Sequence, residues 1–371
     1  MNILITNAEW KSALTCMRSL AKKGHRISLL SSKSHSPTLY SKFCKEKIIC
    51  PDEKYKKDYM SFLNELIKDR KYDFLIPISD LSVEYCSEDR DEILKHVKML
   101  LPSKNGVIIA RSKDQTYRFA QNNGIPIPDT YFPQSWQDIE HIANVISFPC
   151  VVKESNKCAG DGNKYIDSMD KLFTSFKNYE NLQNWPMVQE FIKGKCYSVT
   201  AVCRDGKILD FFMYELVRQY PDTGGMTVYA RSYYNTVAFE FLSKLIEKLS
   251  WTGAIDVDFF ITKDKGFKLL EINPRFGGTT QFAYSCGVDL PLKYFQLAFS
   301  NSCNINPTKY KIGMFYRSIF PQEINSCIKN KKHVKSFIKN FFRLNVCYDF
   351  SLSDPVLLFQ QLKAAKWDIF S

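Results

Sequence analysis

The first hundred residues alternate short apolar runs with segments of helical periodicity. An apolar run at residues 3–5 predicts a strand, and Ala13, Met17 and Leu20 recur at the spacing of one helix face. Further strands are predicted at 27–30 and 74–78, with a helix over about 58–67 between them. Strands that alternate with helices are typical of a doubly wound α/β domain, which we expect over residues 1–106.

The turn after the first strand reads Thr6-Asn7-Ala8-Glu9-Trp10. It has none of the glycines that let backbone approach a dinucleotide pyrophosphate. The domain is therefore interpreted as a scaffold or a lobe for an acceptor substrate, and a nicotinamide site is disfavoured.

The pattern changes after Pro102. A helix is predicted over 113–122 and is ended by Gly124 and the prolines of Ile125-Pro126-Ile127-Pro128. Strands then dominate, at 150–153, 187–191, 198–203, 208–214, 254–261 and 267–272. The tetrapeptides 204–207 and 263–266 are typical of hairpin turns, so we expect antiparallel pairing.

Composition narrows the class of protein. A chain of 371 residues with 45% hydrophobic content buries a substantial core. No apolar run approaches the length of a spanning helix and the start lacks the layout of a secretory signal, so we expect a soluble, cytoplasmic protein. The 12 cysteines are scattered without a CxxC pair, which indicates reduced thiols.

The formal charge of +12 favours anionic partners in general. Lysines cluster at 42–57 and again near 329–343. A Cys/His finger, an RNP-like strand and aromatic-rich basic repeats are all missing from the sequence, so we expect no nucleic-acid partner.

The segment 253–278 carries the strongest chemical signal. Strand alternation puts Asp256 and Asp258 on one face, and Glu271 and Asn273 on one face of the next strand. A turn between the strands lets the two faces converge. Asp258, Glu271 and Asn273 then offer the oxygen ligands that one or two Mg²⁺ ions prefer.

Arg275 lies two residues beyond Asn273, and its guanidinium fits a phosphate or a substrate carboxylate. Gly277 and Gly278 let backbone approach the reacting groups. The alternative is a hairpin with solvated acidic residues. That alternative is disfavoured for the whole set, because burial of carboxylates among Val, Phe, Leu and Ile is costly unless a cation pairs with them.

This stretch resembles the closing motif of the ATP-grasp superfamily, an acidic strand residue followed by Glu-x-Asn-x-Arg and small residues. The resemblance covers residues 107 to about 300 in order. Further matches are Lys113 before the Gly124-Ile125-Pro126-Ile127-Pro128 turn, Pro149-Cys150-Val151-Val152-Lys153 with the loop Ala159-Gly160-Asp161-Gly162, and the hinge strand Val188-Gln189-Glu190-Phe191-Ile192.

The resemblance implies a fold and a set of roles. The fold is α/β (α+β): a doubly wound domain at 1–106, a two-lobed ATP-grasp domain at 107–305 with lobes of about 107–186 and 187–305, and a short C-terminal appendage at 306–371. The implied cofactors are ATP and Mg²⁺, with Mn²⁺ as an alternative. The implied nucleotide contacts are Lys113, Lys153, Gly160, Gly162, Gln189, Glu190, Phe191, Ile192, Asp258 and Arg275, and the implied catalytic residues are Arg275, Lys153, Glu271 and Asn273.

One position departs from the family. After the hinge the superfamily commonly places a glutamate for the ribose hydroxyls, whereas Gly194-Lys195-Cys196-Tyr197-Ser198 has a cysteine there. A further segment, Arg218 to Arg231, is predicted as a loop that closes over substrate, in which Arg218 or Arg231 holds an anionic acceptor. Solvated loop arginines are the alternative interpretation.

The implied activity is ATP-dependent phosphorylation of a small carboxylate to an acyl phosphate, which an amine then attacks, in cell-surface or secondary metabolism. One alternative is phosphorylation of bicarbonate, as in carbamoyl phosphate synthetase or biotin carboxylase, which the single module of this chain disfavours. Another is a non-catalytic nucleotide-binding protein, which the presence of Glu271, Asn273 and both lysines disfavours. With five histidines and neither an HExxH nor a GxSxG motif, zinc and hydrolytic chemistry are disfavoured.

The C-terminal part predicts a basic amphipathic helix. Apolar residues between Val334 and Phe342 recur at helical spacing among the lysines of 329–343. Such a helix either packs against the enzyme or lies on the inner face of an anionic membrane. The family resemblance also favours a homodimer.

Overall fold

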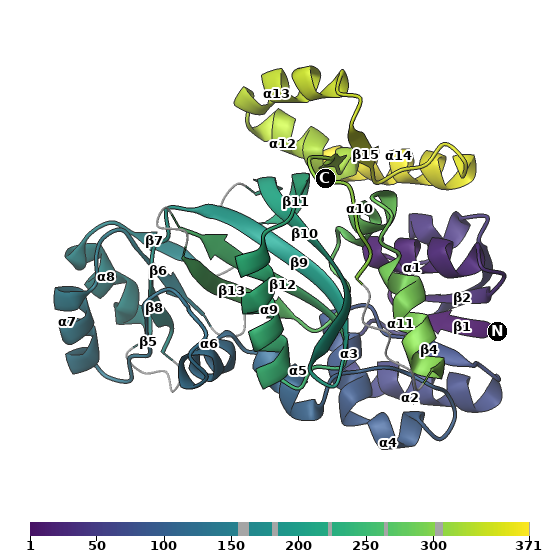
Figure 1. The fold of residues 1–371 in the computed structure, drawn as a ribbon, viewed down its shortest axis with the longest axis horizontal. Coiled ribbons are helices and arrows are strands. Elements are labelled where there is room, and N and C mark those ends of the chain that lie inside the picture. Colours follow the sequence, from purple (N-terminus) through teal and green to yellow (C-terminus); the bar gives the residue numbers. More distant parts are fainter. Residues whose placement is uncertain (155–162, 180–184, 222–224, 263–265, 301–306, 371) are drawn as a thin grey trace.

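The computed structural model describes residues 1–154, 163–179, 185–221, 225–262, 266–300 and 307–370. In this part of the chain the strands form three sheets, surrounded by helices (Figure 1). The mixed α/β fold class predicted from the sequence is confirmed.

The first sheet is parallel, with the strand order β3-β2-β1-β4. Its strands are β1 (Asn2–Ile5), β2 (Arg26–Ser31), β3 (Cys44–Ile49) and β4 (Phe74–Ile76), accompanied by α1 (Lys11–Ala21), η1 (Pro37–Tyr40), α2 (Lys56–Asp69), α3 (Asp80–Glu88), α4 (Arg90–Ile93) and α5 (Lys104–Arg111). The predicted alternation of strands and helices is therefore found. Asn7 and Ser79 follow β1 and β4, and so lie at the same edge of the sheet.

The second sheet is antiparallel, in the order β5-β8-β6-β7. It comprises β5 (Thr130–Tyr131), β6 (Cys150–Lys153), β7 (Lys164–Ile166) and β8 (Met187–Glu190), with α6 (Lys113–Asn122), α7 (Trp136–Val145), α8 (Met169–Phe176) and η2 (Lys177–Tyr179). Buried side chains of α7 and α8, among them Ile139 and Phe176, pack on Val152 and Val188 of this sheet.

The third sheet has seven strands in the order β13-β12-β9-β10-β11-β14-β15. They are β9 (Lys195–Arg204), β10 (Lys207–Tyr220), β11 (Met226–Tyr233), β12 (Gly253–Ile261), β13 (Phe267–Asn273), β14 (Phe315–Arg317) and β15 (Val346–Tyr348). The predicted hairpin between β9 and β10 is present, because Asp205 (φ 50°) and Gly206 (φ 74°) both adopt the left-handed conformation of a tight turn. The other predicted turn, 263–266, lies mostly outside the described residues.

A continuous apolar core joins the first and third sheets. Buried side chains of β1 and α1 belong to the same core as those of β10, α10 (Thr280–Ser285) and α11 (Leu290–Phe299), while α9 (Thr236–Lys248) contributes to a second core with β9 and β12. Helix α1 contacts both α10 and α11. The N-terminal sheet is thus packed directly against the part of the chain that follows the Glu-x-Asn-x-Arg motif.

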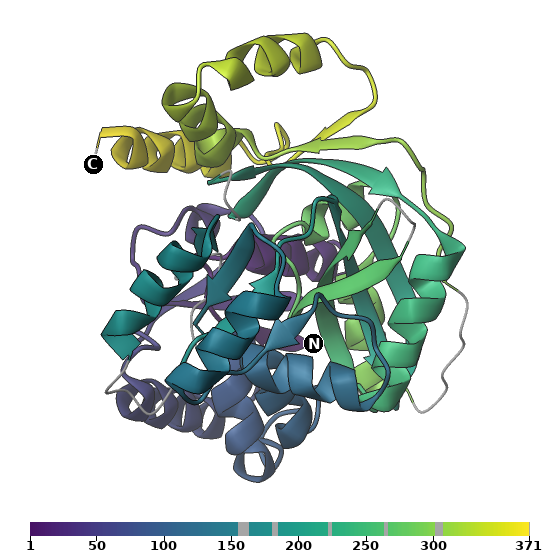
Figure 2. The same cartoon turned by 90° about the vertical axis from the view of Figure 1, so that its left-hand side faces the viewer.

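The C-terminal segment predicted as an appendage extends the third sheet. Strand β14 pairs with β11, and β15 pairs with β14. The remaining elements are η3 (Ile319–Glu323), α12 (Ile324–Lys329), α13 (Lys332–Phe341) and α14 (Pro355–Phe370). Figures 1 and 2 both place α13 at the outer edge of the molecule. In the described part of the chain, no helix combines the length and apolar content that a membrane crossing requires.

The segment 218–231 differs from the predicted loop. Its beginning belongs to β10 and its end to β11, and the two strands pair through contacts such as Gln219 with Thr227. Residues 208–215 of β10 are all buried, and the strand continues past Tyr214, its predicted end, because it pairs with β11 as far as Tyr220.

Candidate active site

Strands β12 and β13 bring the acidic residues of the motif together. In their antiparallel register Asp258 lies opposite Glu271, and Asp256 lies opposite Asn273. Because side chains alternate along a strand, all four share one face of the sheet. This is the arrangement that the alternation of the sequence predicts.

The electrostatics of this face fit a bound cation. Burial, reinforced by Asp256 and Glu271, raises the pKa of Asp258 well above its usual value. Burial also raises the pKa of Asp256 to about 6, against the opposing effect of Arg275. Clustered carboxylates that repel one another accept Mg²⁺ readily, and Asn273 adds an amide oxygen. Among the described residues no group of three or more His, Cys, Asp or Glu forms a metal cluster, so the predicted site depends on two carboxylates and one amide.

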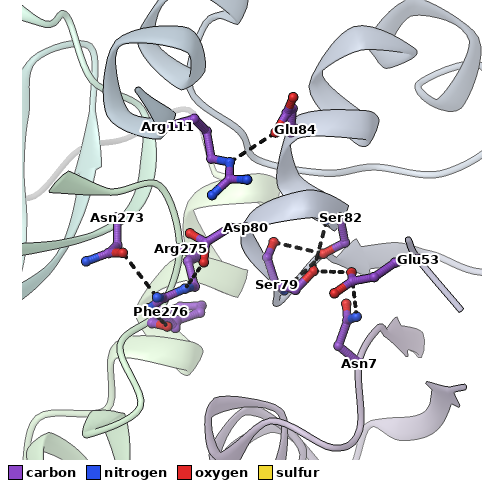
Figure 3. Close-up of polar contacts among 10 residues, drawn as sticks. All are labelled: Asn7, Glu53, Ser79, Asp80, Ser82, Glu84, Arg111, Asn273, Arg275 and Phe276. Carbon is purple, nitrogen blue, oxygen red and sulfur yellow. Dashed lines mark hydrogen bonds and ion pairs between the residues drawn. The ribbon is translucent and has the colours of Figure 1, made fainter. Parts of the chain in front are cut away.

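Arg275 joins this face to the N-terminal domain (Figure 3). Its Nη2 donates to Asn273 Oδ1 at 3.1 Å, and its Nε donates to Asp80 Oδ2 at 3.3 Å. The guanidinium also lies 5.2 Å from the Trp10 ring centre. Burial opposes the charge, but the carboxylates of Asp80 and Asp256 raise the pKa of Arg275 above its usual value. Asp80 and Trp10 were not among the predicted site residues.

The polar groups beside Asp80 also come from the carboxyl edge of the first sheet. Glu53 accepts hydrogen bonds from Asn7 Nδ2 at 2.9 Å and from Ser79 Oγ, and Ser79 caps helix α3 (Figure 3). Burial raises the pKa of Glu53 above its usual value, although both hydrogen bonds oppose this. Parallel sheets commonly bind ligands at this edge.

Lys153 ends β6 and points into the interior. Its side chain is only 6% exposed, and its Nζ donates to Gln189 Oε1 at 2.5 Å and to the Tyr117 hydroxyl at 3.3 Å. Gln189 in turn donates to Thr130 Oγ1 at 2.8 Å. Burial lowers the pKa of Lys153 to about 8, although Glu271 favours the charged form. These amide and hydroxyl oxygens fix the ammonium group, and no carboxylate of the described residues forms an ion pair with it.

A cavity of about 560 Å³ lies between the second and third sheets. Predicted residues that line it are Lys113, Lys153, Gln189, Glu190, Phe191, Ile192, Asp258 and Glu271. Asn273 and Arg275 are absent from the described lining and lie on the side facing the N-terminal domain. The structure thus brings both lysines, the hinge and two carboxylates to one space, and their individual roles stay predictions. The predicted loop glycines Gly160 and Gly162 lie outside the described residues.

The hinge differs in detail from the predicted nucleotide contact. The Glu190 amide donates to Asp129 O at 2.8 Å, so that N–H is already engaged. Its carboxylate pairs with Lys268 Nζ at 2.7 Å. The backbone of Phe191 and Ile192 remains the predicted adenine contact, and both residues line the cavity.

Cys196 lines the same cavity where the family usually has a glutamate. Burial, with Asp258 and Glu271 nearby, raises the pKa of its thiol well above the usual value, which favours the uncharged form. Glu215 on β10 also lines the cavity, and sequence reasoning missed it. Its carboxylate is paired with Lys195 at 2.7 Å and with Arg231. Glu215 reaches the cavity because β10 pairs with β9, a pairing that places Glu215 opposite Tyr197.

Both arginines of the 218–231 segment already pair with carboxylates of the protein. Arg218 forms a buried ion pair with Glu323, and Arg231 pairs with Glu215. The prediction that one of them holds an anionic substrate therefore lacks support from the geometry. The alternative of solvated arginines is wrong for Arg218, whose side chain is 9% exposed.

Comparisons with known proteins agree with this geometry. Residues 110–279 match the family model described as an ATP-grasp domain. N5-carboxyaminoimidazole ribonucleotide synthase of Aquifex aeolicus is 23% identical over 194 residues, which are 51% of this chain and 52% of that protein. The chain thus matches about half the length of this curated relative.

Solved structures share the fold at low identity. The biotin carboxylase domain of Hydrogenobacter thermophilus 2-oxoglutarate carboxylase, in complex with MgADP, ADP and bicarbonate, has a TM-score of 0.68 at 12% identity, over 85% of this chain and 73% of that one. The L-amino acid ligase of Bacillus licheniformis has a TM-score of 0.62 at 13% identity, over 81% of this chain and 74% of that one.

Proposed function

Residues 110–279 are an ATP-grasp domain, and from that premise we propose that the chain is an ATP- and Mg²⁺-dependent, ADP-forming ligase that joins a carboxylate to an amine. The observation that carries the proposal is the cavity between the second and third sheets. It unites two lysines for phosphate, a hinge strand and the paired carboxylates Asp258 and Glu271. The similarity to the L-amino acid ligase supports an amine as the acceptor.

The proposed roles follow from charge and position. Lys113 and Lys153 neutralise nucleotide phosphates from the side of the second sheet. Asp258, Glu271 and Asn273 hold Mg²⁺, which when bound offsets charge on the phosphate oxygens. A carboxylase domain of similar fold binds MgADP, which supports ATP and Mg²⁺ as the cofactors. Arg275 stabilises negative charge on the reacting groups, because Asn273 and Asp80 fix its guanidinium.

Two transfers account for the reaction. A substrate carboxylate oxygen attacks the γ-phosphorus of ATP, the bond to the bridging oxygen breaks, and ADP leaves. The amine nitrogen then attacks the carbonyl carbon of the acyl phosphate, loses a proton and expels phosphate. Phosphate is a good leaving group, so the step requires no strongly perturbed base, in agreement with a cavity whose described lining contains no histidine.

A second candidate is bicarbonate as the phosphorylated carboxylate. The sequence similarity to N5-carboxyaminoimidazole ribonucleotide synthase and the bicarbonate bound to the related carboxylase domain favour it. Both candidates use the same nucleotide cavity and differ in the first acceptor. Substrate dependence therefore separates them.

The test is ADP release from the full chain with ATP, Mg²⁺ and pools of organic acids and amines, with and without added bicarbonate. We expect turnover that requires Mg²⁺ and an organic acid, and that Glu271→Gln abolishes. Glu240→Gln, an exposed carboxylate on α9, is the matched control. Turnover that requires only bicarbonate selects the second candidate. Nucleotide binding without any Mg²⁺-dependent ADP release across both sets contradicts ligase activity.

A further inference from the structure

Helix α13 carries an exposed apolar stripe. Val334, Ile338 and Phe341 are spaced as one helix face, and all three are exposed, Phe341 by 57%. Just beyond the helix, Phe342 and Leu344 are 79% and 103% exposed. Both views of the molecule place α13 at its outer edge (Figures 1 and 2). These five residues are called the apolar stripe below.

Another side of α13 packs against the rest of the protein. The Phe337 ring lies 4.5 Å from the guanidinium of Arg317, which is fully buried. His333 Nδ1 is hydrogen bonded to Ser326 Oγ at 2.7 Å, and Asn340 is 5% exposed. Packing against the enzyme therefore accounts for this side of the helix. Phe341 borders it, because its ring lies 5.9 Å from the same guanidinium, but the side chain stays 57% exposed.

The charge around the stripe has one sign. The sequence from 324 to 348 contains no aspartate or glutamate. Its basic side chains are all exposed: Lys329, Lys331, Lys332, Lys335, Lys339 and Arg343. In the portion that the structure describes, none of these five lysines forms an ion pair. Lys331, Lys335 and Lys339 follow one another at four-residue spacing, beside the apolar stripe.

We propose that this face of α13 docks on an anionic lipid bilayer. The apolar stripe enters the boundary between headgroups and acyl chains, while the lysines contact the acidic headgroups. Charge complementarity selects this occupant. A two-fold contact with a second copy places the lysines of one copy opposite those of the other. The two sets repel each other, which disfavours a dimer through this face. A nucleic acid satisfies the lysines but leaves Ile338 and Leu344 exposed to water.

Vesicle flotation of the full chain tests the proposal. We expect the protein to float with phosphatidylcholine vesicles that contain phosphatidylserine, and not with phosphatidylcholine alone. High salt is expected to release it, because screening weakens attraction to the surface. The double variant Phe341→Ser, Phe342→Ser and the triple variant Lys331→Gln, Lys335→Gln, Lys339→Gln are each expected to lower the partition coefficient by about tenfold or more.

Matched controls distinguish binding through this face of α13 from nonspecific adsorption of the protein to vesicles. Ile108→Ser on α5 removes a comparably exposed apolar side chain, 58% exposed, at another surface. Lys23→Gln, Lys45→Gln and Lys57→Gln together remove the same charge from exposed positions elsewhere. Both controls are expected to float like the wild type. Unchanged thermal unfolding of every variant shows that loss of flotation is not loss of fold.

Three outcomes overturn the proposal. The first is wild-type protein that stays unbound with phosphatidylserine vesicles. The second is equal loss of flotation in the controls. The third is a different occupant: sedimentation that shows a dimer lost in the phenylalanine variant, or an oligonucleotide bound with an affinity that only the lysine variant lowers, while vesicles are not bound. None of these results depends on the ligase activity.

Discussion

Arg275, within the segment that matches the ATP-grasp model, donates to Asp80 of the N-terminal part of the chain, with 3.3 Å between Nε and Oδ2. The contact joins residues 195 positions apart in sequence. Trp10, also from the N-terminal domain, lies against the same guanidinium. The N-terminal domain therefore helps to orient the cation that we assign to the reacting groups.

Asp80→Asn is expected to lower kcat by roughly tenfold or more, since a neutral amide replaces the carboxylate that pairs with Arg275, and hydrogen bonds to charged groups contribute about 1.5–3 kcal/mol. The KM for ATP is expected to change little, because the proposed phosphate lysines are untouched. Steady-state ADP release measures both. Glu84→Gln is the control: Glu84 lies on the same helix but pairs with Arg111, at 3.0 Å, instead of Arg275. Equal losses in the two variants contradict a positioning role for Asp80.

Gly277 and Gly278 are neighbours with opposite surroundings. A Cβ added at Gly277 lies 2.5 Å from Asp256 Oδ1, whereas one added at Gly278 meets nothing within 4 Å. Gly277→Ala is expected to displace the Asp256 carboxylate and to reduce kcat/KM by at least about tenfold, the factor that about 1.4 kcal/mol produces. Gly278→Ala is expected to behave like the wild type in the same assay. Similar activity of both variants contradicts the requirement for close approach at Gly277.

The buried Lys153 predicts a pH dependence. Its pKa is lowered to about 8 by burial, so the ammonium loses its proton as pH rises through that value. If the charged form binds phosphate, kcat/KM for ATP is expected to fall by about tenfold per pH unit above pH 8, because this ratio reports the free enzyme. Lys153→Arg keeps its charge throughout and is expected to remove the decline. A wild-type profile that stays flat to high pH contradicts the assignment.

The sequence predicts the parts of the site that depend on local pattern. Alternation and a turn suffice to pair Asp258 with Glu271, because both strands and their connection lie within one short segment. Lys153 is predicted through the family resemblance, which implies a lysine at the end of this apolar strand. Asp80, Trp10 and Glu215 are missed, because they reach the site through packing between segments far apart in the chain.

The C-terminal strands show a second limit of pattern analysis. β14 and β15 have three residues each, too few to establish a period of two, and β14 ends in an arginine. Arg317 looks like a surface residue in the sequence but is fully buried, because Glu323 accepts from its Nε at 2.8 Å. Only the fold reveals that partner. For this reason the sequence predicts an appendage at 306–371, whereas β14 and β15 extend the third sheet.

That buried carboxylate gives a prediction about stability. Glu323 is fully buried and pairs with both Arg317 and Arg218, so it balances two guanidinium groups at the junction of β10, β14 and η3. Glu323→Gln keeps the shape but removes the negative charge, and leaves the two buried cations to repel each other. Breaking a buried pair in this way is expected to lower the free energy of unfolding by about 3 kcal/mol.

Chemical denaturation of wild type and variants measures this loss. Glu92→Gln is the control, because Glu92 also pairs with two cations, Lys95 at 2.6 Å and Lys68 at 3.2 Å, but in an exposed position. Solvent screens that site and the long lysine side chains regain their freedom, so the control is expected to unfold at the wild-type denaturant concentration. A Glu323→Gln protein as stable as this control contradicts an electrostatic role for the junction. The added strands are then held by apolar contacts such as those of Tyr316 in the shared core.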